Sequence, residues 1–575
     1  MAELTLRHPP ASAAAGGPGR SGVEVAALAH ALLLVVALGV LLHLNRAQWF
    51  QDDEWAFVAG RSVLAEPSSL LEPHNEHWST IPILVYRGLV SLVGARTYLP
   101  YVAVNLLLHL TVVHLLWRCM RRCGVRPWVA TGLSGVLAVF GAGAENLFWA
   151  FQVTWHASLA LGLGQLLLID HHGPPDRRDV VGSGLAVAGL ACSGVSIVMV
   201  AAAGTYALLR RGWRAALVAV SMPAATYLAW FATFGHTAIR SDPTAPSTLL
   251  QAPVFTAIGL DATLEGLTGL PAGGVLMAVG LLAWLLRTAV SRRETAMAAA
   301  LAAGALLFLG LAAVSRIDRW GLEVARWSRY QYVVGALLMP AVGLALTGLL
   351  AFRRSLGTAA VGAGLVWMVA HSALGTVGFA RARAGVELAD RERLVAVADL
   401  GAADARPPIE AKVTPNMELR HLLALRDAGA LPDVPLGGRA RREAEALLRI
   451  GLTDRPALPF ARGPRPTVIA TARAAVEPAG DCLALRSTGP AAQVALAVEE
   501  PGALRVTSEV GGNLFAFVAS SGSTDAVPRV RGMRLEPRQP AFLNVDLAEV
   551  WVTLGLVDAD RATLCGVALP RGGLS

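Results

Sequence analysis

Apolar runs of about twenty residues recur along the first two-thirds of the chain, and most of them are long enough to cross a bilayer as a helix. Only 16% of the residues are charged and 54% are hydrophobic, whereas soluble domains carry about 25% charged residues. This composition excludes a soluble enzyme, a disordered protein and a nucleic-acid-binding domain. We therefore expect a multi-pass α-helical membrane protein.

The apolar runs predict about eleven membrane spans, at residues 23–44, 99–116, 128–145, 150–169, 180–193, 195–209, 215–234, 274–290, 296–314, 331–351 and 358–379. The first run is too long for the core of a signal peptide and no clear cleavage site follows it, so we expect it to be retained. Residues 1–22 form a disordered cytoplasmic tail in this interpretation. The interrupted apolar stretches 81–95 and 253–272 predict amphipathic or re-entrant helices at the outer face.

Clusters of arginine indicate how the spans are oriented. Lys and Arg gather in cytoplasmic loops, so the distribution of the formal charge of +8 matters more than its sum. Five clusters fall where alternating spans require a cytoplasmic loop: Arg118–Arg126, Arg177–Arg178, Arg210–Arg214, Arg287–Arg293 and Arg353–Arg354. We therefore expect a plasma-membrane protein with a cytoplasmic N-terminus and an extracytoplasmic C-terminus.

The character of the sequence changes after residue 380, where the predicted membrane domain (23–380) ends. Residues 381–463 are charged and favour helices, and we expect them to form an extracytoplasmic helical and linker segment. From 464 to 575, short alternating apolar runs are separated by Gly, Pro and Ser. This pattern predicts an extracytoplasmic β-rich domain of the β-sandwich class.

The five cysteines fit this layout. Cys482 and Cys565 flank the β-rich domain on the oxidising side of the membrane, where a disulfide is allowed, and the sequence leaves their pairing open. Cys119 and Cys123 lie at a cytoplasmic helix end without nearby histidines, which is a poor zinc signature, and Cys192 lies within a span. We expect no chemical role for these three.

The first polar segment on the expected outer face follows the first span directly. Asp52, Asp53 and Glu54 are three consecutive carboxylates between aromatic residues. Adjacent like charges repel, so such a group often binds a cation or tunes one member as a base. A solvated helix start is the structural alternative. The sequence implies no certain cofactor, and Asp52 and Asp53 are the expected ligands if a divalent cation such as Mg²⁺ or Mn²⁺ binds.

A second polar segment contains His74, Glu76, His77 and Trp78. In a helix, the two histidines would share one face with a carboxylate between them. The segment is a candidate metal site, acid–base pair or substrate contact. Polar anchoring at the membrane interface, with Trp78 as the interfacial residue, explains it equally well.

A third segment carries four arginines on the side of the membrane where positive charge is normally depleted: Arg316, Arg319, Arg326 and Arg329. A basic loop resting on lipid headgroups is one interpretation. However, Arg329 and Tyr330 lie at the mouth of a predicted span, where an arginine can hold a phosphate through two parallel hydrogen bonds. We therefore expect this segment to bind an anionic substrate.

A smaller polar group lies at the outer end of a predicted helical hairpin. Glu145, Gln152 and His156 share one helical face. Such residues are costly in or near a bilayer unless they face a cavity, which makes them candidate substrate contacts. Hydrogen bonding between helices is the structural alternative.

Carboxylates, histidines and arginines from separated loops thus gather on one side of the membrane. An acid, a base and phosphate-binding arginines are what a transferase needs when its donor carries a phosphate leaving group. A lipid-linked donor would explain why such a site is built into a membrane protein.

The arrangement resembles the GT-C superfamily of integral-membrane glycosyltransferases, whose members typically carry Asp-Asp or Asp-Glu just after the first span, where Asp52, Asp53 and Glu54 stand here. The Ala-, Gly- and Arg-rich composition is similar to that of actinobacterial members. The resemblance implies an inverting transfer with Asp52 or Asp53 as the base, Asp52 being preferred. Glu54 would position the base or bind a cation. Arg326 and Arg329 would hold the donor phosphate by chemical analogy.

The partners that the resemblance implies are a polyprenyl-phosphate-linked sugar and a glycan, lipid or protein acceptor of the cell envelope, together with membrane lipid and without nucleic acid. The main alternative is a transporter or flippase for a lipid-linked or anionic substrate. The chain lacks a convincing internal repeat and its polar residues crowd at one face, which favours an enzyme. A non-catalytic envelope-assembly scaffold is the other alternative.

Overall fold

The computed structural model describes residues 20–61, 70–238, 246–271, 295–352, 354–404, 408, 410–414, 416–459, 465–489, 492–520, 531–557 and 559–569 of the 575-residue chain. The predicted tail up to residue 19, the predicted span 274–290, the cluster Arg287–Arg293 and Arg353 lie outside these residues. The chain separates into two compact units. The first contains Met1–Phe50, Arg61–Ser91 and Tyr98–Gly385, and the second contains Gln51–Gly60, Leu92–Thr97 and Val386–Ser575.

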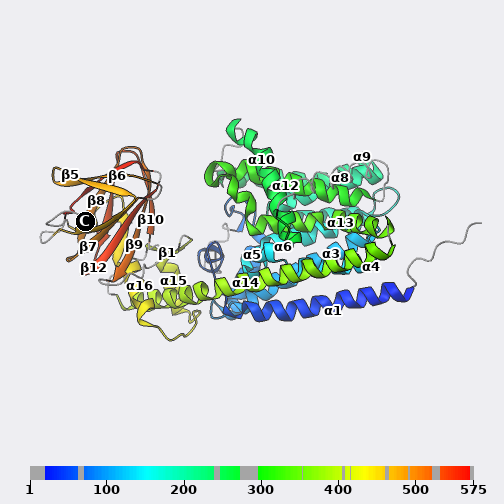
Figure 1. The fold of residues 1–575 in the computed structure, drawn as a ribbon, viewed down its shortest axis with the longest axis horizontal. Coiled ribbons are helices and arrows are strands. Elements are labelled where there is room, and N and C mark those ends of the chain that lie inside the picture. Colours follow the sequence, from blue (N-terminus) through cyan, green and yellow to red (C-terminus); the bar gives the residue numbers. More distant parts are fainter. Residues whose placement is uncertain are drawn as a thin grey trace, which may run out of the picture. The chain divides into compact units, whose positions relative to one another are not determined.

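The first unit is built from helices, several of which run side by side (Figure 1). They are α1 (Arg20–Leu44), α2 (Thr80–Val93), α3 (Leu99–Arg122), α4 (Pro127–Ala138), α5 (Ala144–Phe148), α6 (Val153–Ile169), α7 (Arg177–Leu190), α8 (Val195–Arg211), α9 (Trp213–Thr233), α10 (Pro246–Thr268), α12 (Ala296–Trp320), α13 (Ser328–Phe352) and the start of α14 (Arg354–Ala403). Within the described ranges, eight helices are long and apolar enough to cross a membrane. The protein is therefore a multi-pass helical membrane protein, as predicted.

Two of the predicted spans in the described ranges are not among these eight helices. The segments expected at 180–193 and 195–209 form α7, with 14 residues, and α8, with 17 residues. Most of the stretch expected to be amphipathic or re-entrant at 253–272 belongs to the 23-residue helix α10, which ends at Thr268 and packs against α12 and α13. The other such stretch forms the short apolar helix α2.

The exposed face of α1 has the character of a lipid-facing surface. Leu28, Leu32 and Val35 each leave more than 60% of their surface uncovered by the protein. In water, a row of large apolar side chains along one helix would form an unfavourable patch. In a bilayer it meets lipid tails, and the helix satisfies its own backbone hydrogen bonds.

Helix α14 continues past the point where the sequence becomes polar. It runs for 50 residues, from Arg354 to Ala403, whereas the last predicted span ends at residue 379. The charged stretch after Val386 favours a helix and contains an Asp390–Arg393 ion pair one turn apart, at 3.0 Å. No proline interrupts the pattern before Pro407. The change in polarity therefore marks a change of environment for the side chains and not the end of the helix.

The second unit joins short segments from the N-terminal half of the chain to its C-terminal part. Gly94 adopts a left-handed conformation (φ +60°), and a Cβ atom there would come within 3.0 Å of the Ala430 backbone. The Ala95 amide donates to the Ala430 carbonyl at 2.8 Å. This close approach, which only glycine allows, attaches residues 92–97 to the end of helix α15 (Leu419–Asp427).

The strands of the second unit form two large antiparallel sheets and one hairpin. The hairpin pairs β1 (Lys412–Thr414) with β2 (Met417–Glu418). The five-stranded sheet has the order β10 (Arg531–Leu535), β9 (Gly512–Ser520), β12 (Val550–Val557), β7 (Ala492–Val498) and β4 (Thr467–Ala472). The six-stranded sheet has the order β3 (Ile450–Thr453), β11 (Pro540–Val545), β8 (Gly502–Ser508), β13 (Arg561–Cys565), β6 (Cys482–Ser487) and β5 (Ala474–Ala479). The predicted β-rich C-terminal domain is thereby confirmed.

The six-stranded sheet begins before the predicted boundary at residue 464. Strand β3 follows helix α16 (Gly438–Arg449) directly and pairs with β11. Its four residues are too few to give an alternating pattern, so the sequence alone assigned them to the helical and linker segment. On the same sheet, Cys482 of β6 and Cys565 of β13 lie directly opposite each other and form a disulfide.

Candidate functional site

The three carboxylates after the first span differ sharply in exposure. Glu54 is fully buried, and its Oε2 accepts a hydrogen bond from the Gln51 amide at 3.0 Å. Asp52 is exposed and adopts a left-handed backbone conformation (φ 43°), which Asp tolerates better than most residues. Asp53 is half-buried. Glu54 therefore acts as a cap for its own turn, while the two aspartates are accessible.

A residue far along the chain reaches the same loop. The side-chain amide of Asn416 donates a hydrogen bond to Asp53 Oδ1 at 3.1 Å. Asn416 lies between strands β1 and β2, so both groups belong to the second unit. Residues 381–463 were expected to be a helical and linker segment without a site residue, and nothing in the sequence marks Asn416 as a contact of the acidic loop.

The segment around the two histidines is a tight turn and not a helix. The amide of His74 donates to the His77 carbonyl at 2.9 Å, and the amide of His77 donates to the His74 carbonyl at 3.0 Å. Asn75 within the turn has a positive φ of 52°. The side chains of His74 and His77 therefore do not share a helical face. Trp78 lies beyond the turn and stacks on Trp230 of α9, with ring centroids 5.4 Å apart.

The turn presents Glu76 to the third predicted segment. Both oxygens of the Glu76 carboxylate accept hydrogen bonds from the Arg316 guanidinium, at 2.9 and 3.1 Å. Partial burial alone would raise the pKa of Glu76. The hydrogen bonds and charge of Arg316, together with the charge of His77, outweigh that effect and hold the pKa below its usual value. The pair is therefore ionised at neutral pH.

A second pair of the same kind joins Arg329 to Glu145, with Nη1 and Oε1 3.0 Å apart. The Arg329 guanidinium also lies over the Trp327 ring, 4.2 Å from its centroid, and 5.8 Å from that of Trp149. Each ion pair leaves roughly a fifth to a quarter of its side-chain surface uncovered. In each pair the glutamate holds the guanidinium in place, and the uncovered part of the arginine can still be reached by another anion.

Tyr330 connects the two pairs. Its ring centroid is 6.0 Å from the Arg329 guanidinium, and its hydroxyl lies within hydrogen-bonding reach of Arg316. The ring also stacks on Trp155 of α6, with centroids 6.0 Å apart. Three of the predicted segments therefore contribute to one cluster within the first unit, which consists of Glu76, Glu145, Arg316, Arg329 and Tyr330. We call it the arginine cluster.

Arg326 faces three carboxylates at the edge of the first unit. Asp261, Glu265 and Glu323 each place an oxygen 3.9 Å from its guanidinium. These contacts are long and exposed, and pairs of this kind contribute little to stability. The side chain of Arg319 lies outside the described part of the chain.

Gln152 and His156 are buried within the helix bundle. His156 Nδ1 is 2.8 Å from Asn105 Oδ1, and the Asn146 amide donates to Gln152 Oε1 at 3.3 Å. Asn105 in turn donates to the Asn146 carbonyl at 2.8 Å. Both side chains are almost fully covered by protein. Their observed contacts are the helix–helix hydrogen bonds of the structural alternative.

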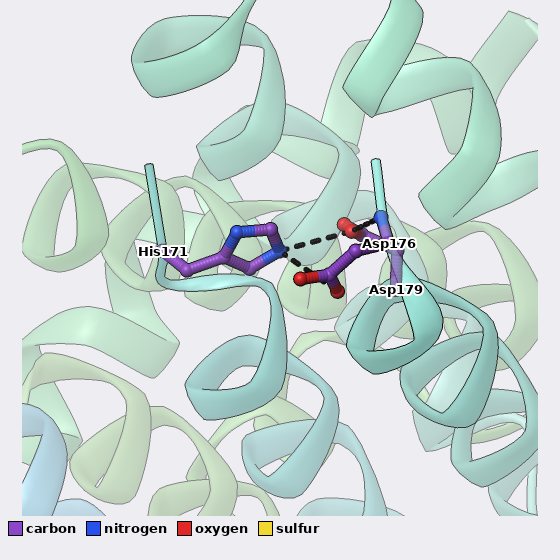
Figure 2. A group of neighbouring side chains, drawn as sticks. All are labelled: His171, Asp176 and Asp179. Atoms are coloured by element: carbon purple, nitrogen blue, oxygen red, sulfur yellow. Dashed lines mark hydrogen bonds and ion pairs between the residues drawn. The ribbon is translucent and has the colours of Figure 1, made fainter. Parts of the chain in front are cut away.

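A further ionic cluster, which sequence reasoning missed, surrounds the start of α7 (Figure 2). His171 Nε2 lies 2.9 Å from Asp179 Oδ2 and 3.5 Å from Asp176 Oδ1. Arg211 binds both oxygens of Asp179, at 2.5 and 3.2 Å. One sequence signal was available: two aspartates three residues apart before an apolar run are typical of a helix N-terminus. Asp176 and Asp179 form a capping box at the start of α7.

Among the described residues, His171, Asp176 and Asp179 are the one group of three side chains close enough to share a metal ion. Arg211 already neutralises Asp179, the most buried member of the group. A cation would have to displace this guanidinium, so the cluster fits an internal ion-pair network better than a metal centre. The binding of Mg²⁺ or Mn²⁺ by Asp52 and Asp53 stays a prediction.

No model of a known protein family matches the chain, and no curated protein sequence matches it. Among solved structures, the chain is similar to ArnT from Cupriavidus metallidurans bound to undecaprenyl phosphate, with 13% sequence identity and a TM-score of 0.41, over 71% of this chain and 85% of that one. ArnT from the same organism in the apo state aligns with 16% identity, the same TM-score and the same coverage. A TM-score of this size is too low to carry over a fold or an activity, so support for a function comes from the residues described above.

Proposed function

We propose that the chain is a membrane glycosyltransferase of the GT-C type, which transfers a sugar from a polyprenyl-phosphate donor to a cell-envelope acceptor at the extracytoplasmic face. One observation carries the proposal. Glu54 is buried and caps its own turn, whereas Asp52 and Asp53 remain accessible directly after the first membrane helix. A general base needs such an accessible carboxylate on a rigid support. The outward orientation of this loop rests on the arginine pattern of the sequence.

In the proposed reaction, Asp53 accepts the proton of an acceptor hydroxyl. The acceptor oxygen attacks the anomeric carbon of the sugar as the bond from that carbon to the phosphate oxygen breaks. The polyprenyl phosphate leaves with the electron pair, and the configuration at the anomeric carbon is inverted. We favour Asp53 over Asp52 because Asp53 is half-buried and held by Asn416, whereas Asp52 is exposed.

The arginine cluster is the proposed site for the donor phosphate. The guanidinium forks of Arg316 and Arg329 can bind phosphate oxygens bidentately, and both flank Tyr330. Each arginine is held by a glutamate and remains partly uncovered. A phosphate that enters would share or replace the glutamate contacts and gain charge stabilisation as it departs from the sugar. Arg326, which has only long contacts, is a further candidate ligand.

The test is a transfer assay on purified full-length protein with a panel of polyprenyl-phospho-sugars, in which the release of polyprenyl phosphate is measured. Asp53→Asn should lower the rate by about 10²–10⁴-fold, the usual contribution of a general base. Glu500→Gln is a matched control, since this carboxylate is exposed in the β-rich domain and lies outside the proposed machinery.

Three results would count against the proposal. If the wild-type protein turns over no donor but moves a lipid-linked or anionic substrate across a liposome membrane, the transporter interpretation holds. If a reporter fused to the C-terminus is active only in the cytoplasm, the acidic loop faces the wrong side for an extracytoplasmic reaction. Unchanged transfer by both Asp52→Asn and Asp53→Asn would remove the acidic loop from the mechanism.

A further inference from the structure

The β1–β2 hairpin gives Asn416 a fixed position. Val413 on β1 and Met417 on β2 are buried, with 4% and 2% of their surfaces exposed. After β2, the Leu419 amide donates to the Ala411 carbonyl at 2.8 Å and closes the base of the hairpin. Asn416 directly precedes β2, whose Met417 is buried, so its backbone is anchored on that side.

The acidic loop is equally well fixed on its own side. The Ala56 amide donates to the Asp53 carbonyl at 3.1 Å, and the Glu54 amide donates to the Gln51 carbonyl at 3.0 Å. The following short helical segment, Ala56–Gly60, buries Phe57 and Val58 completely. The backbone of Asp53 is therefore held, and rotation of its side chain is the freedom that remains.

The 3.1 Å bond from Asn416 to Asp53 Oδ1 restricts that rotation. Its two partners are 363 positions apart in the sequence, so the bond is not a by-product of local turn geometry. An amide N–H also favours the ionised form of a carboxylate over the protonated form. A base must be ionised and correctly oriented before it can take a proton.

We propose that Asn416 is a positioning residue for Asp53, and that the β1–β2 hairpin is therefore part of the machinery for sugar transfer. The Asn416 amide fixes the plane of the Asp53 carboxylate and keeps it ionised, while Asp53 alone exchanges a proton with the acceptor. This inference rests on the proposed function, because it assigns Asp53 the role of the base.

The test uses Asn416→Asp in the full-length protein, which keeps the shape of the side chain and replaces its donor by a second carboxylate. We expect the acid limb of the pH–rate profile to move upward by about one pH unit, because the Asp53 carboxylate loses a hydrogen-bond donor and gains a like charge beside it. The rate at neutral pH should fall at least about tenfold, with the donor KM unchanged. Hydrogen–deuterium exchange of residues 51–60 should become faster. Lys412→Ala, at an exposed position of the same hairpin, is the matched control and should match the wild type.

A swapped variant, Asp53→Asn with Asn416→Asp, separates the positioning role of the hydrogen bond from the proton transfer by Asp53. It restores the hydrogen bond with donor and acceptor exchanged, so slow exchange of residues 51–60 should return while activity stays lost. If the swap restores activity as well, Asp53 is not the base and the inference is wrong. It is also wrong if Asn416→Asp leaves both the exchange and the pH profile unchanged.

The exchange experiment does not depend on turnover. If the wild type transfers sugar from no donor in the panel, the proposed function fails, and the role assigned to Asn416 in catalysis fails with it. The exchange rates of the single and swapped variants then still decide whether Asn416 holds the acidic loop. The two failures are therefore distinguishable.

Discussion

Two carboxylate–guanidinium pairs of the helical unit share their chemistry but differ in exposure. Asp179 and Arg211 are 1% and 5% exposed, and Asp179 also accepts hydrogen bonds from His171 and from the Asp176 amide. Glu76 and Arg316 are 23% and 19% exposed. The first pair is buried among protein groups, whereas the second can still be reached by a ligand. The comparison separates an ion pair that supports the fold from one that can bind an anion.

The largest effect is expected where the buried pair is broken. Asp179→Asn leaves the Arg211 charge buried without its partner, and we expect unfolding to become easier by about 3–5 kcal/mol. Thermal unfolding in detergent measures the change. Asp176→Asn is the control, because Asp176 is 41% exposed and Asn caps a helix as well as Asp does. Equal losses in the two variants would contradict the distinction.

The second effect concerns the partly exposed pair of Glu76 and Arg316. Arg316→Ala should reduce transfer from polyprenyl-phospho-sugars by about 10²-fold, since under the proposed function it removes a ligand of the donor phosphate. Stability should change by less than about 1 kcal/mol. Arg316→Lys keeps the charge without the fork and should lie between wild type and Arg316→Ala. A stability loss as large as that of Asp179→Asn, without a selective loss of rate, would make this pair structural too.

The pH dependence of the Glu76–Arg316 pair gives a smaller effect. The pKa of Glu76 is lowered in the folded protein, so its contribution to stability is present above the unfolded value of about 4.5 and is lost as the pH falls through the folded value. Wild type and Glu76→Gln should differ by less than about 1 kcal/mol near pH 7 and converge below pH ~4.5. Unfolding curves of the two proteins from pH 7 to pH 3.5 test this. A gap that widens on acidification would contradict the assigned sign.

The smallest effect is expected from the aromatic support of Arg329. Trp327→Leu removes a cation–π contact of about 0.5–1 kcal/mol and should raise the donor KM by a few-fold. Arg214 lies over Trp213 at 5.5 Å in a similar contact elsewhere in the unit. Trp213→Leu should leave the donor KM unchanged, and a shared effect on KM would point to a general loss of helix packing.

Hydropathy and alternation predicted the fold well because each depends on a short stretch of sequence. The runs at 99–116 and 331–351 became α3 and α13, and the alternating apolar runs predicted after residue 464 became strands such as β7 and β12. The end of the last membrane helix was harder to predict, because α14 continues past the point where the sequence becomes polar. The actinobacterial resemblance rests on composition alone and stays a prediction.

The site was harder to predict because it depends on which segments meet. The three-residue spacing of His74 and His77 suggested a shared helical face, but Asn75 adopts a left-handed conformation and closes a turn. Asn416 carries no local signal and is identified only by its contact with Asp53. For His156, the sequence left a cavity and helix–helix bonding open; the structure shows a buried contact with Asn105, and a substrate contact stays a prediction.

The disulfide between Cys482 and Cys565 sets an order of events in biosynthesis. It links β6 to β13, and its two cysteines are 83 positions apart in the sequence. The bond cannot form until Cys565 has left the ribosome, and it needs an oxidising compartment. A chain that stopped short of Cys565 would keep Cys482 as a free thiol. The state of Cys482 therefore gives the cell a chemical mark that distinguishes chains containing the paired strand from chains that lack it.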